Sequence, residues 1–434
     1  LMVVTDLGDS DVDMTGGSDV CIRASAMKAC AASGEVESFY GMLSIRTSDS
    51  DKMNERAPVV IVAVVDKSGS MAGAKLTALK KTLLCVIQVM KQTDSLGIIE
   101  YDTNVSTSFP LSLMTPEAKV TANNVVHNMR SGSSTNLSSG LLEGIRMMPK
   151  KQETMINSVL LMTDGLANHG ITTSKGILAM MRQEELNCCI NTFGFGSDHD
   201  TGMLKDIADA GDGMYYYIQD DSSIAENFGD CLAGLFSVVG QGAEILLHSH
   251  DGYEIKKVWT FKKLTEIEPG QQYRAYVGDL QAGEERDIPI EFRLPKETPG
   301  TIKQIASATL SYFDVNSEEM VQAKCEITLR RSSQEEFDGE AYNMEVDKHC
   351  NRCFGSKALL DASELASQGS MNEAKSLLQN TINQIEASPS ASDPFCKTLL
   401  GEMKSALSGF VDRATYRSRG QYRARGRGSS WASQ

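Results

Sequence analysis

Three strongly apolar runs frame the first half of this chain: residues 58–65 (PVVIVAVV), 156–164 (INSVLLMTD) and 188–196 (CCINTFGFG). A strand that is apolar on both faces must be covered on both faces, as in a parallel sheet between two layers of helices. Amphipathic helical patterns separate the runs, the first of them over residues 76–90. We therefore expect an α/β domain with a doubly wound, mostly parallel sheet over residues 57–240.

The sequence changes character after this domain. Short alternating apolar runs broken by turns fill residues 241–331, which predicts an antiparallel β-sandwich. Residues 19–50 also look extended, and we expect them to pair with that sandwich. Helical periodicity returns over residues 335–411, with a turn at Gly369 between two helices. The fold class is thus α/β, with a β-sandwich domain and a helical C-terminal segment added.

The two ends of the chain have biased compositions. Residues 1–18 are acidic and rich in Gly and Ser, and residues 412–434 form a basic tail; we expect both to be disordered. The formal net charge is −15, although residues 413–434 carry six arginines and no acid. The acidic body disfavours nucleic acid and suits partners with basic surfaces. The Arg-rich tail is either a solvated end or a segment that associates with RNA.

The cysteines and the apolar content bear on the compartment. Ten cysteines are scattered through a chain that is long enough to fold without disulfides, so we expect no disulfide framework. No basic segment followed by an apolar core opens the sequence, which begins with Leu1. The longest clean apolar run, residues 59–65, is too short to span a bilayer. We expect a soluble, cytoplasmic protein with no membrane span.

Three loops carry oxygen-bearing side chains at expected strand ends or just before expected helices. The loop DKSGS directly follows the first apolar run, the loop SGSSTN precedes a helical pattern, and TDG closes the second run. Open parallel sheets bind ligands at the carboxyl ends of their strands, so we expect these loops to meet. The candidate metal ligands are Asp66, Ser68, Ser70, Thr135 and Asp164.

These five side chains offer two carboxylates and three hydroxyls. Such hard oxygen donors suit Mg²⁺, with Mn²⁺ or Ca²⁺ as possible alternatives. With so few carboxylates around it, the ion stays electrophilic and can accept a carboxylate from a partner protein's Asp or Glu. The pattern therefore predicts a divalent-cation-dependent protein-binding module that is not an enzyme.

Other chemistries fit the sequence less well. The stretch GSMAGAKLT (69–77) has the wrong spacing for a phosphate-binding P-loop. An aspartyl-phosphate phosphatase would have a second Asp at position 68, where this chain has serine. The run HCNRC (349–353) offers half of a zinc site, but the only later cysteine is Cys396. The histidines have no nucleophile at a recognisable spacing, which leaves hydrolase chemistry without support.

The order Asp-x-Ser-x-Ser, then Thr, then Asp-Gly resembles the von Willebrand factor type A (VWA, or VWFA) domain and its metal-ion-dependent adhesion site (MIDAS). In that family the two serines bind the metal directly and the aspartates often bind it through water. The threonine binds directly or through water according to the state of the domain. The resemblance implies these roles for Ser68 and Ser70, for Asp66 and Asp164, and for Thr135.

The likeness extends past the site. Residues 193–204 (FGFGSDHDTGML) and 231–241 (CLAGLFSVVGQ) are similar to a eukaryotic VWA subgroup whose sandwich and helical tail resemble the intein-like Vwaint region. Plant members of that subgroup can carry a RING ubiquitin-ligase domain ahead of the VWA domain. No cluster of RING-type zinc ligands occurs in the present sequence. The resemblance implies, as an alternative function, the substrate-recruiting part of a ubiquitin-ligase-type protein.

Overall fold

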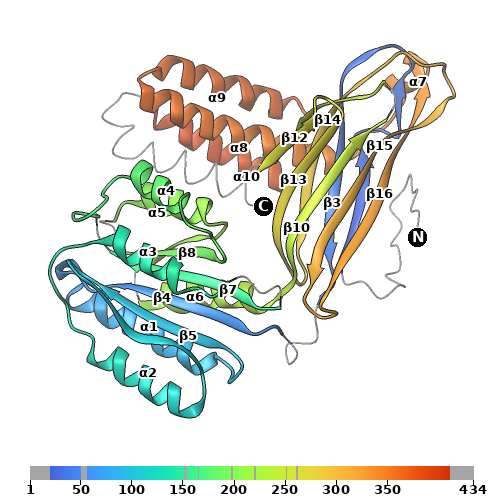
Figure 1. Ribbon diagram of the computed structural model, residues 1–434. Coiled ribbons are helices and arrows are strands. Elements are labelled where there is room, and N and C mark those ends of the chain that lie inside the picture. Colours follow the sequence, from blue (N-terminus) through green and yellow to red (C-terminus); the bar gives the residue numbers. More distant parts are fainter. Residues whose placement is uncertain are drawn as a thin grey trace. The chain divides into compact units, whose positions relative to one another are not determined.

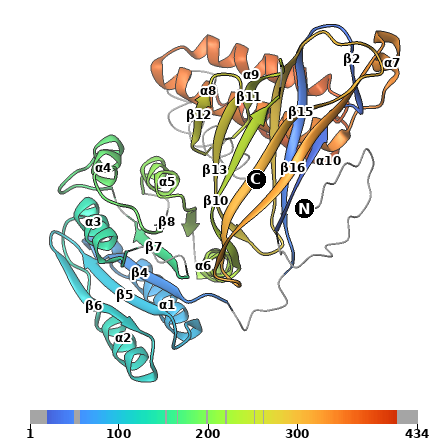
Figure 2. The same cartoon turned by 45° about the vertical axis from the view of Figure 1, so that its right-hand side comes forward.

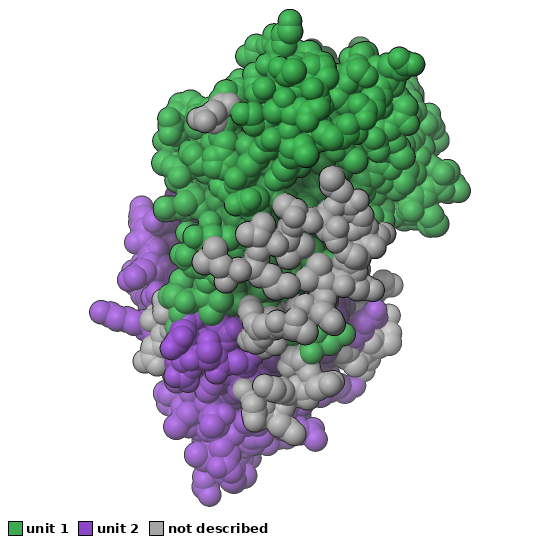
Figure 3. Space-filling model, turned by 90° about the vertical axis from the view of Figure 1, so that its right-hand side faces the viewer, with its two compact units in different colours: residues 1–49, 242–313, 320–434 green, residues 50–241, 314–319 purple. Residues whose placement is uncertain are grey.

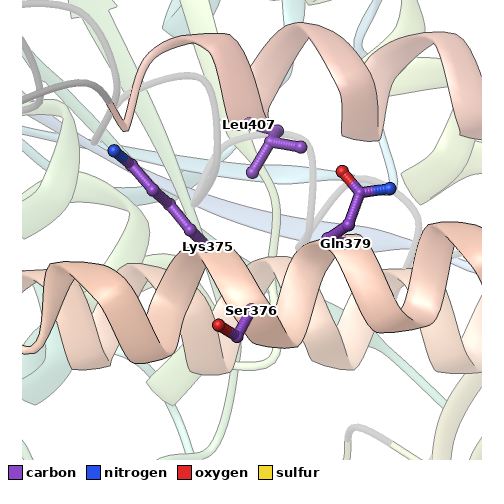
Figure 4. Close-up of a pocket in the computed structure, with 4 residues that line it drawn as sticks. All are labelled: Lys375, Ser376, Gln379 and Leu407. Atoms are coloured by element: carbon purple, nitrogen blue, oxygen red, sulfur yellow. The ribbon is translucent and has the colours of Figure 1, made fainter.

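A computed structural model of the protein describes residues 20–49, 56–150, 154–164, 166–196, 199–218, 221–250, 252–260 and 262–410. Its internal contacts divide the chain into two compact units, which Figure 3 distinguishes by colour. Unit 2 comprises residues 50–241 and 314–319, and unit 1 comprises residues 1–49, 242–313 and 320–434. The ends for which we predict disorder, residues 1–18 and 412–434, lie outside the described residues.

Unit 2 is built on one six-stranded sheet. In spatial order its strands are β6 (Val105–Leu113), β5 (Ser95–Tyr101), β4 (Val59–Asp66), β7 (Ile156–Thr163), β8 (Cys189–Phe195) and β9 (Tyr215–Ile218). β6 pairs antiparallel with β5, and the other neighbours pair in parallel. This confirms the predicted doubly wound, mostly parallel sheet, and it places β4 and β7, the strands that lead into two of the candidate loops, side by side at the centre.

Helices cover both faces of this sheet (Figure 1). One face packs against α1 (Ala74–Val89), α2 (Pro116–Asn128) and α6 (Asp221–Phe236), and the other against α3 (Leu137–Met147), α4 (Ser174–Met181) and α5 (Thr201–Ala210). Along β4, Ile61 and Ala63 belong to the first core while Val62 and Val64 belong to the second. All eight residues of β4 are buried, which explains its continuous apolar run.

Two helices end earlier than their sequence patterns predict. The pattern over residues 173–186 predicts a helix that in fact ends at Met181, because the next four residues, RQEE, offer no apolar side chain to the core. The sequence of residues 222–239 also predicts one helix, but that helix ends at Phe236, and Val238 begins a strand. Since Val and the following apolar residues favour strands as well as helix cores, the pattern does not locate this boundary.

The described residues of unit 1 form two sheets, whose strands can be followed in Figure 2. The first has the order β1 (Val20–Ala26), β3 (Val36–Thr47), β14 (Glu285–Leu294) and β11 (Glu254–Val258). The second has the order β12 (Leu264–Glu268), β13 (Gln272–Gln281), β10 (Val238–Ser249), β15 (Ile302–Asp314), β16 (Glu319–Ser332) and β2 (Cys30–Ala32). β3 pairs antiparallel with both β1 and β14, so the N-terminal strands join strands more than 200 residues later in the chain.

Helices complete unit 1: α7 (Gln334–Gly339), α8 (Met344–Gln368), α9 (Met371–Glu386) and α10 (Pro394–Ser408). The last three share a core that includes Leu359, Leu378 and Leu399. α8 ends at Gly369, whose φ of 99° lies in the left-handed region that glycine adopts without strain. No helix in the described part of the chain is long and apolar enough to cross a membrane.

Candidate functional site

Asp66 ends the central strand β4, and its carboxylate organises the DKSGS loop. One carboxylate oxygen, Oδ1, accepts a hydrogen bond from the Ser68 backbone N–H at 2.8 Å, and Oδ2 accepts one from the Thr163 hydroxyl at 2.6 Å. The loop then turns into a short 3₁₀ helix, Gly69–Met71, directly before α1. Asp66 therefore ties the end of β4 to the end of the neighbouring strand β7.

Asp164 follows β7 directly, and a chain of hydroxyls connects it to the first loop. The Ser70 hydroxyl donates to Asp164 Oδ1 at 2.8 Å, and the Ser68 and Ser70 hydroxyl oxygens lie 3.1 Å apart. The other Asp164 oxygen, Oδ2, lies 2.5 Å from the ammonium group of Lys75 on α1. The structure thus brings four of the five predicted ligands, Asp66, Ser68, Ser70 and Asp164, into one connected group.

Thr135 reaches the same edge through contacts between backbones. The Gly69 N–H donates to the Ser133 carbonyl at 2.8 Å, which joins the DKSGS loop to the loop before α3. The Thr135 N–H donates to the side chain of Asn168 at 2.8 Å. Thr135 is almost fully buried. Its loop is therefore fixed both to the first loop and to the segment that follows Asp164.

The two carboxylates are buried, and the Lys75 ammonium contacts that of Asp164. The pKa of Asp66 is raised to about 6, chiefly because the carboxyl is buried; the hydrogen bonds from Thr163 and Ser68 oppose this rise, and the nearby charge of Asp164 adds to it. Lys67 lies between two predicted ligands in sequence, yet its ammonium pairs with Glu100 at 3.1 Å. The ammonium group of Lys67 is thus paired away from the site carboxylates, and Lys75 is the lysine that contacts one of them.

The chemistry of this donor set fits a hard divalent cation. All five predicted ligands offer oxygen, and the two acids are fully or almost fully buried. A buried carboxylate is stable when a cation or hydrogen bonds compensate its charge. Within the described residues, no three His, Cys, Asp or Glu side chains gather in a group that could hold a metal. A cation at the candidate site would therefore depend on the serine and threonine hydroxyls.

The other sequence candidates have structural explanations. His349, Cys350 and Cys353 lie on α8, where burial raises the pKa of the Cys353 thiol to about 11. The His349 Nε2 atom lies 3.4 Å from Asp287 Oδ2, so a carboxylate is the neighbour of this ring nitrogen. Asp200 caps the N-terminus of α5, because its side chain accepts a hydrogen bond from the Met203 N–H at 2.9 Å. All ten cysteines are free thiols.

Sequence reasoning missed three residues around the site: Thr163, Asn168 and Lys75. Thr163 directly precedes Asp164 and could have been identified as the last buried residue of an apolar strand. Asn168 belongs to a loop whose sequence carries no such signal. Lys75 lies in the first turn of α1, where a positive charge opposes the helix dipole, and this mismatch is the sequence signal for a nearby acid.

Comparison with known families decides what this domain is. A family model described as the von Willebrand factor type A domain matches residues 61–230. Residues 61–230 are a von Willebrand factor type A domain. A second family model, described as the N-terminal region of the CPSF6-like RSLD domain, matches residues 342–434. The VWA match covers the whole of the candidate site. The second match covers α8 to α10 and the basic tail, and our sequence analysis did not predict a relation to this second family.

Two curated relatives illustrate the likeness in sequence. The chain is 28% identical to the E3 ubiquitin-protein ligase WAV3 of Arabidopsis thaliana over 276 residues, which are 62% of this chain and 35% of WAV3. It is 33% identical to the inter-alpha-trypsin inhibitor heavy chain H3 of Homo sapiens over 178 residues, which are 38% of this chain and 19% of that protein. The matches thus span about a third and a fifth of these relatives. The WAV3 similarity supports the predicted relation to plant RING-VWA proteins.

Solved structures extend the likeness to most of the chain. A von Willebrand factor type A protein from Catenulispora acidiphila superposes with a TM-score of 0.70 at 14% identity, covering 93% of this chain and 96% of that one. The ArnB paralog VWA2 from Sulfolobus acidocaldarius gives a TM-score of 0.58 at 16% identity, covering 95% and 99%. At such low identity these matches establish the fold alone: a VWA domain joined to further sheets and helices.

Proposed function

We propose that this protein binds other proteins through its VWA domain in a divalent-cation-dependent manner. VWA domains are in general non-catalytic interaction modules, and Asp66, Ser68, Ser70, Thr135 and Asp164 form the proposed cation site. The observation that carries the proposal is the connected group at the ends of β4 and β7. There, the backbone N–H of Ser68 and the hydroxyls of Ser68 and Ser70 connect the two buried carboxylates.

The exposure of the donors supports this role. Ser70 is exposed, while Asp66, Ser68 and Asp164 are buried, so the group opens to solvent on the side of Ser70. An Mg²⁺ ion held there would keep positions for water or for an incoming oxygen ligand, since it favours six oxygens. A carboxylate from a partner's Asp or Glu matches such a position, and the surrounding loops would select among partners.

The test is affinity capture from cell extract with the purified full chain, in MgCl₂ or in EDTA, followed by mass spectrometry. Asp66→Asn and Asp164→Asn are each expected to abolish the recovery of Mg²⁺-dependent partners while retaining the far-UV circular dichroism of the wild type. A matched acid-to-amide control is Asp361→Asn, which removes an exposed ion pair with Lys357 on α8. Equal recovery of the same partners in EDTA, or by either site variant, would refute the proposal.

The similarity to WAV3 favours a second candidate function, the recruitment of substrates for ubiquitin transfer. In this role the same cation site would hold the substrate, while the ligase domain would lie in another part of a longer chain or in another protein. Ubiquitin transfer by the full-length protein to a captured partner, lost in Asp66→Asn, would support it. Association with RNA through the basic tail stays a prediction, which deletion of residues 413–434 and measurement of retained RNA would test.

A further inference from the structure

The ammonium group of Lys75 lies against one carboxylate of the proposed cation site. It lies 2.5 Å from Asp164 Oδ2, and the Asp164 side chain is fully buried. The Ser70 hydroxyl occupies the other oxygen, Oδ1. Both oxygens of the Asp164 carboxylate are therefore engaged by groups of this chain, one of which is a full positive charge.

Local structure accommodates Lys75 in this orientation. Gly73 caps the N-terminus of α1, and a lysine two residues later faces the positive end of the helix dipole, which is unfavourable. On the other side, a Cβ at Gly196 would lie 3.0 Å from Lys75 Cε, and Gly196 has a φ of 77° that favours glycine. The lysine is thus placed against its local helix preference and beside a position where a side chain would crowd it.

We propose that Lys75 is an internal cation that competes with the divalent ion for Asp164. This inference rests on the proposed function and concerns the regulation of the same site. Without metal, the ammonium compensates the buried carboxylate and stabilises the domain. When a divalent ion binds, its charge repels the ammonium, and Lys75 moves out to solvent. Its side chain is 29% exposed, so the flexible stem has a route out of the site.

The proposal predicts opposite effects of one substitution on stability and on metal affinity. Lys75→Met keeps the length of the side chain and removes its charge. In EDTA the variant should unfold at a lower temperature than the wild type, because Asp164 loses its ammonium partner. Titrated with MgCl₂, the variant should bind the ion about tenfold tighter or more, which corresponds to about 1.4 kcal/mol. A lysine that merely positioned Asp164 for the metal would give weaker binding in Lys75→Met.

The experiment combines isothermal titration calorimetry with MgCl₂ and thermal unfolding in EDTA or MgCl₂, on the full chain. The matched control is Lys67→Met, which removes the neighbouring lysine that pairs with Glu100, and it should leave the Mg²⁺ affinity unchanged. Lys75→Arg keeps the charge and can engage a carboxylate with two N–H groups, so it should weaken Mg²⁺ binding. If Lys75→Met folds only when MgCl₂ is present, the proposal is also supported.

The outcomes separate this inference from the proposed function. Unchanged or weaker Mg²⁺ binding by Lys75→Met, beside saturable binding by the wild type, overturns the role of Lys75 and leaves the cation site intact. If Lys75→Met fails to fold in any buffer, Lys75→Arg decides, and unchanged or tighter binding by that variant overturns the role. Binding by Lys75→Met but not by the wild type supports competition. Absence of binding in both refutes the cation site itself.

Discussion

The buried carboxyl of Asp66 should make the metal-free protein lose stability as the pH rises. Burial and the nearby Asp164 raise the pKa of Asp66 from 3.8 to about 6. The folded state therefore holds the Asp66 proton more tightly than the unfolded state does. In the window between these two values the folded protein binds more protons, so the free energy of unfolding decreases with increasing pH.

The size of this effect follows from the two pKa values. A tenfold difference in proton affinity corresponds to about 1.4 kcal/mol, so the charged carboxylate costs the folded state about 3 kcal/mol above pH 6. About half of this loss, roughly 1.4 kcal/mol, falls between pH 5 and pH 7. Asp66→Asn cannot carry the charge, and its amide can still accept from the Ser68 N–H and donate to the Thr163 hydroxyl oxygen.

The assay is urea denaturation of wild type and Asp66→Asn in EDTA at several pH values from 5 to 8. Because both proteins share every other titrating group, the difference between their free energies of unfolding isolates Asp66. As the pH rises to 7, the wild type should lose stability relative to Asp66→Asn, so the free energy of unfolding of the variant minus that of the wild type should increase. Saturating MgCl₂ should then stabilise the wild type and leave the variant unchanged. A difference that is flat with pH, or that moves in favour of the wild type in EDTA, would refute the reasoning.

Two further predictions concern a closely packed glycine and a buried arginine. A Cβ at Gly140 on α3 would lie 2.5 Å from the buried ring of Tyr101, so Gly140→Ala should destabilise the protein by about 1–3 kcal/mol in urea denaturation. Gly401 on α10 has nothing within 4 Å of such a Cβ, and Gly401→Ala should be neutral or stabilising; equal effects of the two would contradict this. Arg331→Met should cost about 3 kcal/mol or more by the same assay, since buried Arg331 donates to the carbonyls of Ala32, Gly34 and Pro295 and its loss leaves these acceptors unsatisfied. Arg330→Met, which breaks an exposed pair, should change stability by less than about 0.5 kcal/mol, and a comparable loss there would argue against a special role for Arg331.

The central strands could be predicted because their environment imposes one composition. β4 and β7 are buried along their whole length, which favours strands made largely of apolar residues. β12 could not be predicted, because all five of its residues (LTEIE) are exposed and its pairing with β13 is a matter of backbone hydrogen bonds. α4 and α6 end where the following residues no longer pack as a helix against the core, and the local sequence pattern does not predict this position.

The sequence by itself determined which side chains are candidate ligands and which loops carry them. Asp66, Ser68 and Ser70 lie two residues apart, and Asp164 ends an apolar run, so these candidate ligands can be identified from short stretches of the sequence. What the tertiary structure decided is how these groups are compensated. Lys67 is nearer to the candidate ligands in sequence, yet it forms an ion pair with Glu100 on β5. Lys75 instead pairs with Asp164, which lies 89 residues later in the chain. The energy of an ion pair depends on the distance between the two charges and on how deeply they are buried, and both are set only by the packed fold.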